Sequence, residues 1–274
     1  MKNIFAAILG VLLFFLPGQP AFAADATNDL DTLVIKVRTD IEAGKKTEAD
    51  LADDLKQFDV LFAAHKGETN DVPAQILVMK AMLYLEIIND PEKGRSMLNQ
   101  VKTNFPDTKW AAQGNMILAM MDKQAEASKI REALKAGTKF PGFSETDVDG
   151  KPLSIASYKG KVVLIDFWAT WCGPCVGEMP NVIETYQKHH AQGFEIIGVS
   201  LDEDKAKLTQ FTKENDMAWQ QFFDGQVWSN KLAVKYGIQG IPATFLLDGE
   251  GNIIGEDLRS DELEAAVAKA VAKK

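Results

Sequence analysis

Hydrophobic and polar positions divide this chain into a helical half and a half in which strands alternate with helices. From about residue 28 to 136, apolar side chains recur at positions i, i+3, i+4 and i+7, the spacing that places them on one face of an α-helix. The two clearest series are Leu30, Leu33, Val34, Val37 and Ile41, and then Leu51, Leu55, Phe58 and Phe62. Turn or capping residues precede further helices at Asn70–Pro73, Asp90–Pro91 and Phe105–Asp107. The pattern predicts an all-α domain of helical hairpins over residues 24–136.

Two prolines suggest a repeat within this helical half. Pro73 and Pro106 open similar helices and lie 33 positions apart, close to the tetratricopeptide period. The full signature of that repeat is missing and barely two units fit, so a tetratricopeptide-like domain and a generic bundle both stay open. No catalytic constellation occurs in this half. Met120 and Met121 have core spacing and are expected to pack inside, and His65 is interpreted as a surface residue.

From Thr138 onwards the pattern changes to short apolar runs bounded by turn residues. The runs predict strands at 162–167, 194–200, 243–248 and 252–255, and the segments between or after them predict helices at 174–191, 204–215, 229–236 and 261–272. Asp149–Gly150 predicts a hairpin turn ahead of the first central strand. Alternating strands and helices predict an α/β domain over residues 138–274, with helices on both faces of its sheet.

Composition and the N-terminal residues indicate which partners and which cellular compartment to expect. The formal net charge is −9 and no run of Lys or Arg occurs, which argues against nucleic acid or an anionic membrane surface as a partner. Lys2, the apolar run Ile4–Leu16 and Ala21–Ala23 form the pattern of a secretory signal peptide, residues 1–23. The run is short for a bilayer-spanning helix, which needs about 20 apolar residues, so an uncleaved anchor is the alternative. We expect export across the inner membrane into the periplasm.

The chain has two cysteines, Cys172 and Cys175, and their close spacing points to chemistry rather than to stapling of the fold. The predicted strand 162–167 ends, the chain turns, and a helix begins within the pair. Cys172 would lie at the helix N-terminus, where unpaired N–H groups and the helix dipole favour the thiolate, lower its pKa and make it the attacking sulfur. Cys175, one turn later, would resolve the mixed disulfide. A zinc site would need two further ligands, and an inert structural disulfide is the other alternative.

The segment Leu164–Cys175, with its aromatic-flanked Cys-Gly-Pro-Cys, resembles the active-site motif of thioredoxins. Residues from about 138 to 274 resemble the thioredoxin-fold domain of the TlpA/ResA-like periplasmic thioredoxins. The resemblance implies a thioredoxin fold, a central mixed sheet flanked by helices, preceded here by the helical domain. It also implies that Asp166, six residues before Cys172, is the buried acid that relays a proton to or from Cys175. Burial beside the cysteines would disfavour the charged carboxylate and suit it to acid–base work.

Two further positions, one acidic residue and one proline, match the same family. Glu178 corresponds to the acid of the TlpA/ResA-like pattern and is implied to tune the active site, while a solvated first-turn helix charge is the alternative. Pro180 matches the proline that kinks the helix. Having both Asp166 and Glu178 makes this sequence a hybrid, because many TlpA/ResA-like proteins lack the strand aspartate.

The resemblance also implies how a substrate docks. Gly240–Thr244 resembles the cis-proline loop that faces the cysteines, so the Ile241–Pro242 bond is implied to be cis. The backbone at Ile241 and Pro242 would pair with an extended substrate segment. Trp171, Gly173 and Pro174 would complete an apolar rim on which a partner rests.

These residues predict a thiol–disulfide oxidoreductase that acts on protein thiols and disulfides without metal or organic cofactor. Gly-Pro between the cysteines and Ile241 before Pro242 are the thioredoxin choices, which favours a reductant that a membrane thiol donor must recharge; a thiol oxidant or isomerase is the alternative. A peroxidase would need a peroxidatic cysteine pattern that is absent. The copper-delivery proteins of this fold use a wider cysteine spacing and a histidine later in the chain, and none follows His190. A protein-interaction scaffold, in which the helical domain binds a partner, stays open.

Overall fold

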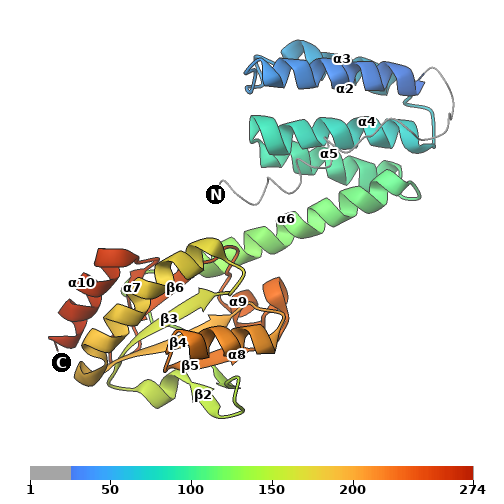
Figure 1. The fold of residues 1–274 in the computed structure, drawn as a ribbon. Helices are drawn as coiled ribbons and strands as arrows, with labels where there is room; N and C mark the ends of the chain where they lie inside the picture. Colours follow the sequence, from blue (N-terminus) through green and yellow to red (C-terminus); the bar gives the residue numbers. More distant parts are fainter. Residues whose placement is uncertain (1–25, 274) are drawn as a thin grey trace. The chain divides into compact units, whose positions relative to one another are not determined.

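The computed structural model describes residues 26–273 and consists of two compact units that meet between Asp122 and Lys123 (Figure 1). The predicted signal peptide, residues 1–23, lies outside the described residues. Within 26–273, no helix combines the length and the apolar character needed to cross a membrane. The border between the units falls inside a helix, nearer the N-terminus than the sequence border at 136–138.

The first unit is helical, as predicted. Its helices are α2 (Ala26–Glu42), α3 (Ala52–Ala64), α4 (Asp71–Met82), α5 (Pro91–Asn104) and the first part of α6 (Lys109–Ala133). The cap predicted at Asp90 forms, because its side chain accepts a hydrogen bond from the N–H of Lys93. At the predicted turn Asn70–Pro73, the side chain of Asn70 also caps a helix by accepting from the N–H of Val72. A π-helical turn, Leu83–Ile88, extends α4. Met120 was expected in the core, but its side chain is 44% exposed, because on the long helix α6 it points away from the face that packs.

The second unit contains a five-stranded mixed sheet, as the resemblance implied. Its strands are β3 (Val162–Trp168), β4 (Phe194–Ser200), β5 (Gln220–Phe223), β6 (Ala243–Leu247) and β7 (Ile253–Glu256), in the order β5-β4-β3-β6-β7. Strands β3, β4 and β5 run parallel, and β6 and β7 run antiparallel to their neighbours. All seven residues of β3 are buried, which explains its continuous apolar pattern. Ahead of the sheet, β1 (Ser144–Thr146) and β2 (Pro152–Ser154) form the hairpin predicted from Asp149–Gly150.

Helices cover both faces of this sheet. They are α7 (Gly173–His189), α8 (Lys205–Glu214), α9 (Lys231–Lys235) and α10 (Ser260–Val271). Side chains alternate along β3, so Asp166 and Trp168 point to one face and Phe167 to the other. Trp168 packs against Phe211 of α8, whereas Phe167 contacts Tyr236 directly after α9. The segment that follows the carboxyl end of β3 leads directly into α7.

Candidate active site

The two cysteines form a disulfide at the N-terminus of α7. Cys172 is the N-cap of this helix, and its Sγ accepts a hydrogen bond from the N–H of Cys175, with 3.2 Å between the two atoms. Cys172 is 6% exposed and Cys175 is 2% exposed. In the reduced chain, N–H groups at the helix start would stabilise a Cys172 thiolate, so Cys172 has both the electrostatics and the access of an attacking sulfur.

Asp202 holds the loop that leads into the disulfide. It is the second residue after β4, is buried, and accepts hydrogen bonds from the N–H of Thr170 (3.1 Å) and from its hydroxyl (2.5 Å). The hydroxyl of Ser200 donates to its second oxygen at 2.8 Å. Sequence reasoning missed this residue, although its position two residues after a predicted strand is a signal, since carboxyl ends of neighbouring parallel strands meet at one edge.

Two tryptophans stand exposed beside the disulfide. Trp171 is 50% exposed and Trp228 is 43% exposed, and their ring centroids lie 6.0 Å apart in an edge-to-face arrangement. Gly173 and Pro174 are also exposed. Trp228 was not identified from the sequence. It follows Val227, whose φ of 47° is an outlier for a β-branched residue. The exposed aromatic surface next to Cys172 is therefore larger than the sequence indicated.

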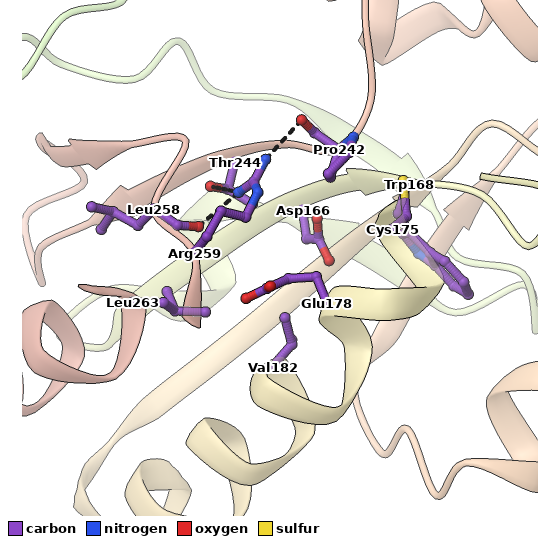
Figure 2. A pocket seen from close by; sticks show the side chains of 10 residues that line it. All are labelled: Asp166, Trp168, Cys175, Glu178, Val182, Pro242, Thr244, Leu258, Arg259 and Leu263. Atoms are coloured by element: carbon purple, nitrogen blue, oxygen red, sulfur yellow. Dashed lines mark hydrogen bonds between the residues drawn. The ribbon is translucent and has the colours of Figure 1, made fainter. Parts of the chain in front are cut away.

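The cis-proline loop, Gly240–Thr244, lies next to the disulfide. The Ile241–Pro242 peptide bond is cis, as the resemblance implied, and Pro242 lines the same pocket as Cys175 (Figure 2). Among the described residues, none forms a hydrogen bond with the main chain of Ile241. An extended peptide that approaches this loop would therefore meet a main-chain donor and acceptor that are not already paired.

The last turns of α6 support this loop from the sheet's other face. The side chain of Gln239 donates to the carbonyl oxygen of Gln124 at 3.0 Å. Gly237 has a φ of +64°, and a β-carbon added there would lie 2.3 Å from the carbonyl oxygen of Ala127. Glycine is required here for both conformation and space. The end of α6 is thus part of the second unit.

Asp166 lies in the middle of β3 and points into the pocket that Cys175 also lines (Figure 2). It is 4% exposed, and its carboxyl group forms no hydrogen bond with a described residue. Burial raises the pKa of Asp166 from 3.8 to about 7; the Arg259 guanidinium opposes this rise and the Glu178 carboxylate adds to it. A carboxyl group with a pKa near neutrality can both take up and release a proton under ordinary conditions.

Glu178 lies in the same pocket, but its carboxylate is engaged by the start of α10. One oxygen accepts a hydrogen bond from the N–H of Ser260 at 2.5 Å, and the other lies 3.3 Å from the amide nitrogen of Asn181. Since the first N–H groups of a helix have no partner within it, Glu178 satisfies one of those of α10. Both oxygens of its half-buried carboxylate therefore have hydrogen-bond partners.

Arg259, which sequence reasoning did not single out, completes the pocket. Its guanidinium donates hydrogen bonds to the carbonyl oxygen of Pro242 (2.7 Å), the hydroxyl of Thr244 (2.9 Å) and the carbonyl oxygen of Leu258 (2.7 Å) (Figure 2). An arginine directly before a predicted helix carries no local signal of such a role. The structure thus gathers Asp166, Cys175, Glu178 and Pro242 around one pocket. Cys172 is bonded to Cys175, but Trp171, Gly173, Pro174 and Ile241 are not among the residues that line this pocket.

Comparisons with known proteins agree with this geometry. The sequence pattern of the redoxin family, "Redoxin", matches residues 135–272. The thiol–disulfide oxidoreductase ResA of Bacillus thuringiensis subsp. konkukian is 35% identical over 125 residues, which cover 46% of this chain and 70% of the relative. ResA of Bacillus subtilis is 31% identical over 124 residues, covering 45% of this chain and 68% of the relative.

Solved structures similar to this chain come from the same group of proteins. The thioredoxin domain of a thiol–disulfide oxidoreductase from Bacteroides vulgatus is 33% identical, covers 50% of this chain and 99% of that chain, and has a TM-score of 0.47. A thiol:disulfide interchange protein of the thioredoxin family from Chlorobium tepidum is 29% identical, covers 50% and 97%, and has a TM-score of 0.43. With its redoxin match, its ResA relatives and its Cys172–Cys175 pair, this chain belongs to the redoxin family, among the ResA/TlpA-like thiol–disulfide oxidoreductases.

Proposed function

We propose that this chain reduces disulfide bonds of other proteins in the periplasm, with the Cys172–Cys175 pair as its redox group and no metal or organic cofactor. The observation that carries the proposal is the disulfide at the start of α7, placed between a buried acid and a cis-proline loop with free main-chain groups. Export rests on the signal-peptide pattern of residues 1–23 and on the extracytoplasmic setting typical of ResA-like relatives.

The proposed reaction moves two electrons from the chain to its substrate in two exchange steps. The Cys172 thiolate attacks one sulfur of a substrate disulfide, forming a mixed disulfide and releasing a substrate thiolate. Cys175, once deprotonated, attacks Sγ of Cys172, which releases the second substrate thiolate and leaves the Cys172–Cys175 disulfide seen here. A dithiol donor must then reduce the pair again, and for an exported chain we propose a membrane thiol donor.

Asp166 is the group placed to take the proton from Cys175. Both residues line one pocket, and the raised pKa of Asp166, about 7, makes the exchange of a proton feasible near neutral pH. Because Cys175 is almost fully buried, bulk solvent does not reach its thiol. The proton would therefore pass to Asp166 either directly or through one bound water molecule. In the reverse step, the protonated acid would return the proton to the thiolate that leaves when the disulfide is reduced.

Substrate docking would use both sides of the disulfide. The unpaired main chain of Ile241, next to Pro242, would bind an extended segment of the substrate as an added strand. Trp171 and the newly identified Trp228 would pack against apolar side chains beside the substrate cysteine, the role for which exposed tryptophans are suited.

The direction of electron flow is tested by the reduction potential of the pair. We expect equilibration with defined glutathione or dithiothreitol ratios to give a value near that of thioredoxin, roughly −270 mV. A value towards roughly −120 mV would identify a thiol oxidant and overturn the proposed direction. Cys175→Ser tests the mechanism itself, because the variant should accumulate a mixed disulfide through Cys172 that its Cys172→Ser counterpart cannot form.

We further propose that the helical unit, which ends at Asp122, selects or holds the protein partner, because the residues that carry the chemistry lie within 138–274. The Cys172→Ser and Cys175→Ser double variant separates this role from catalysis. If the double variant retained the full cellular phenotype of the wild type, the chain would act as an interaction scaffold rather than as an oxidoreductase.

A further inference from the structure

Arg259 reaches from the turn before α10 to the cis-proline loop. Its guanidinium donates at 2.7 Å to the carbonyl oxygen of Pro242 and at 2.9 Å to the hydroxyl of Thr244 (Figure 2). Pro242 and Thr244 lie on either side of Ala243, where β6 begins. One side chain therefore fixes two points of the segment that links the docking loop to the sheet.

The side chain is itself held at its base. The carbonyl oxygen of Leu258 accepts a third bond from the guanidinium. Asp257 pairs with Thr244 twice, since its carboxylate accepts from the N–H of Thr244 at 3.1 Å and its own N–H donates to the carbonyl oxygen of Thr244 at 2.9 Å. Beyond the arginine, the carboxylate of Glu178 accepts from the N–H of Ser260. The arginine thus stands in a turn fixed on both sides.

The guanidinium of arginine is planar, and its N–H donors point in fixed directions, so two acceptors bound to it are held in a fixed relative position. The ammonium group of lysine, on a flexible side chain, does not impose such a geometry. The carbonyl of Pro242 is bound on the pocket side, while the main chain of Ile241 just before it has no described partner. Holding one group fixes the orientation of the other, because they belong to consecutive residues.

We propose that Arg259 is a positioning residue for protein substrates: by binding Pro242 and Thr244 at once, it holds the main chain of Ile241 in the geometry that an incoming substrate strand requires. This inference rests on the proposed function, and it adds a residue outside the cysteine motif and the cis-proline loop. Arg259 does not touch the reacting sulfurs in this arrangement, so its effect on exchange passes through the loop and through Asp166.

Arg259 also faces the acid of the site. The charged groups around Asp166 are Arg259 from the turn before α10 and Glu178 from α7, with Cys175 of the disulfide as the third neighbour able to titrate once reduced. The guanidinium opposes the burial that raises the pKa of Asp166. Without it, Asp166 would keep its proton to higher pH, and the pH midpoint of any step that needs the carboxylate would rise.

The test compares the full-length wild type with Arg259→Gln and Arg259→Lys on two substrates, insulin as a protein disulfide and a small aromatic disulfide. For insulin we expect KM to rise about ten-fold in Arg259→Gln, the size of one lost charge-assisted hydrogen bond, with partial rescue in Arg259→Lys. The KM for the small disulfide should stay within two-fold of the wild type, since it does not pair with the loop. The pH midpoint of turnover should move upward in Arg259→Gln.

Two further variants keep the result interpretable. Thr244→Val removes one of the two anchors without changing the charge, and should raise KM for insulin while leaving the pH midpoint in place. Lys161→Gln, which loses an ion pair with Glu195 near the start of β3 and β4, should match the wild type on both substrates. If the wild type is active and the KM for insulin is unchanged in both Arg259→Gln and Thr244→Val, the role of Arg259 is overturned while the proposed function stands. A wild type that reduces neither substrate overturns the proposed function as well.

Discussion

Replacing Asp166 by asparagine should stabilise the oxidised protein at pH 8 and remove most of the pH dependence that this residue gives to its stability. Asp166 is buried in the centre of β3, and its pKa is raised from 3.8 to about 7. A carboxyl group with a raised pKa binds its proton more tightly in the folded than in the unfolded chain. Stability is therefore highest below pH 3.8 as far as this group is concerned, and it falls as pH rises towards 7.

The size of this effect follows from the shift. About three pKa units at about 1.4 kcal/mol each correspond to about 4 kcal/mol of destabilisation once Asp166 is ionised in both states. Asparagine cannot ionise and has nearly the same shape, but its amide N–H groups would enter a pocket without a partner for each of them, which costs about 1–3 kcal/mol. The net gain of Asp166→Asn at pH 8 is then about 1–3 kcal/mol, shrinking towards zero and below as pH falls to 5.

The measurement is denaturant unfolding of the oxidised wild type and variant between pH 5 and 8, followed by fluorescence. Four of the five tryptophans, all except Trp110, lie in the second unit, so the signal reports mainly on the unit that contains Asp166. Asp202→Asn is the matched control, because that buried carboxylate accepts several hydrogen bonds and its replacement should destabilise the protein. If Asp166→Asn kept the wild-type slope of stability against pH, burial of an ionisable Asp166 would be refuted.

Two other substitutions test the docking surface and its support. Trp228→Ala should lower kcat/KM for a protein disulfide several-fold while leaving turnover of a small disulfide unchanged, and Ile254→Ala, which removes a side chain of similar exposure on β7, should alter neither rate. Gly237→Ala should destabilise the second unit by about 1 kcal/mol for its positive φ and by a further ~1–3 kcal/mol for the clash with α6. Gly137→Ala shares the positive φ but meets no neighbouring atom, so equal losses in thermal stability from the two variants would contradict the packing of α6 against Gly237.

The parts of the fold that the sequence predicts well are those with a strong local pattern. β4 begins and ends at the predicted residues, and the N-cap at Asp90 forms as expected, because a strand buried on both faces and a capped helix start are encoded in consecutive residues. The cysteine motif is also predicted well from the sequence, because its strand, turn and helix start lie within one short segment.

What the sequence does not reveal depends on distant segments. Strand β5 opens with Gln220 and Gln221, and Gln221 is buried because its side-chain oxygen accepts a hydrogen bond from the indole of Trp168, far away in the chain. Trp228 becomes part of the site only through its contact with Trp171. Arg259 resembles any charge before a helix until the turn that carries it is folded against β6.

The paired acids illustrate the same limit at the centre of the site. The sequence resemblance assigns proton transfer to Asp166 and leaves Glu178 either as an acid that tunes the site or as a solvated helix charge. The structure separates them by their partners: Glu178 is bound to the N–H of Ser260 and contributes negative charge, whereas the carboxyl group of Asp166 has no hydrogen-bond partner among the described residues and faces Cys175. Burial raises the pKa of Asp166 to about 7, the Arg259 guanidinium opposes that rise, and the Glu178 carboxylate adds to it. We therefore expect the acid that is bound to α10 to tune the acid that exchanges the proton.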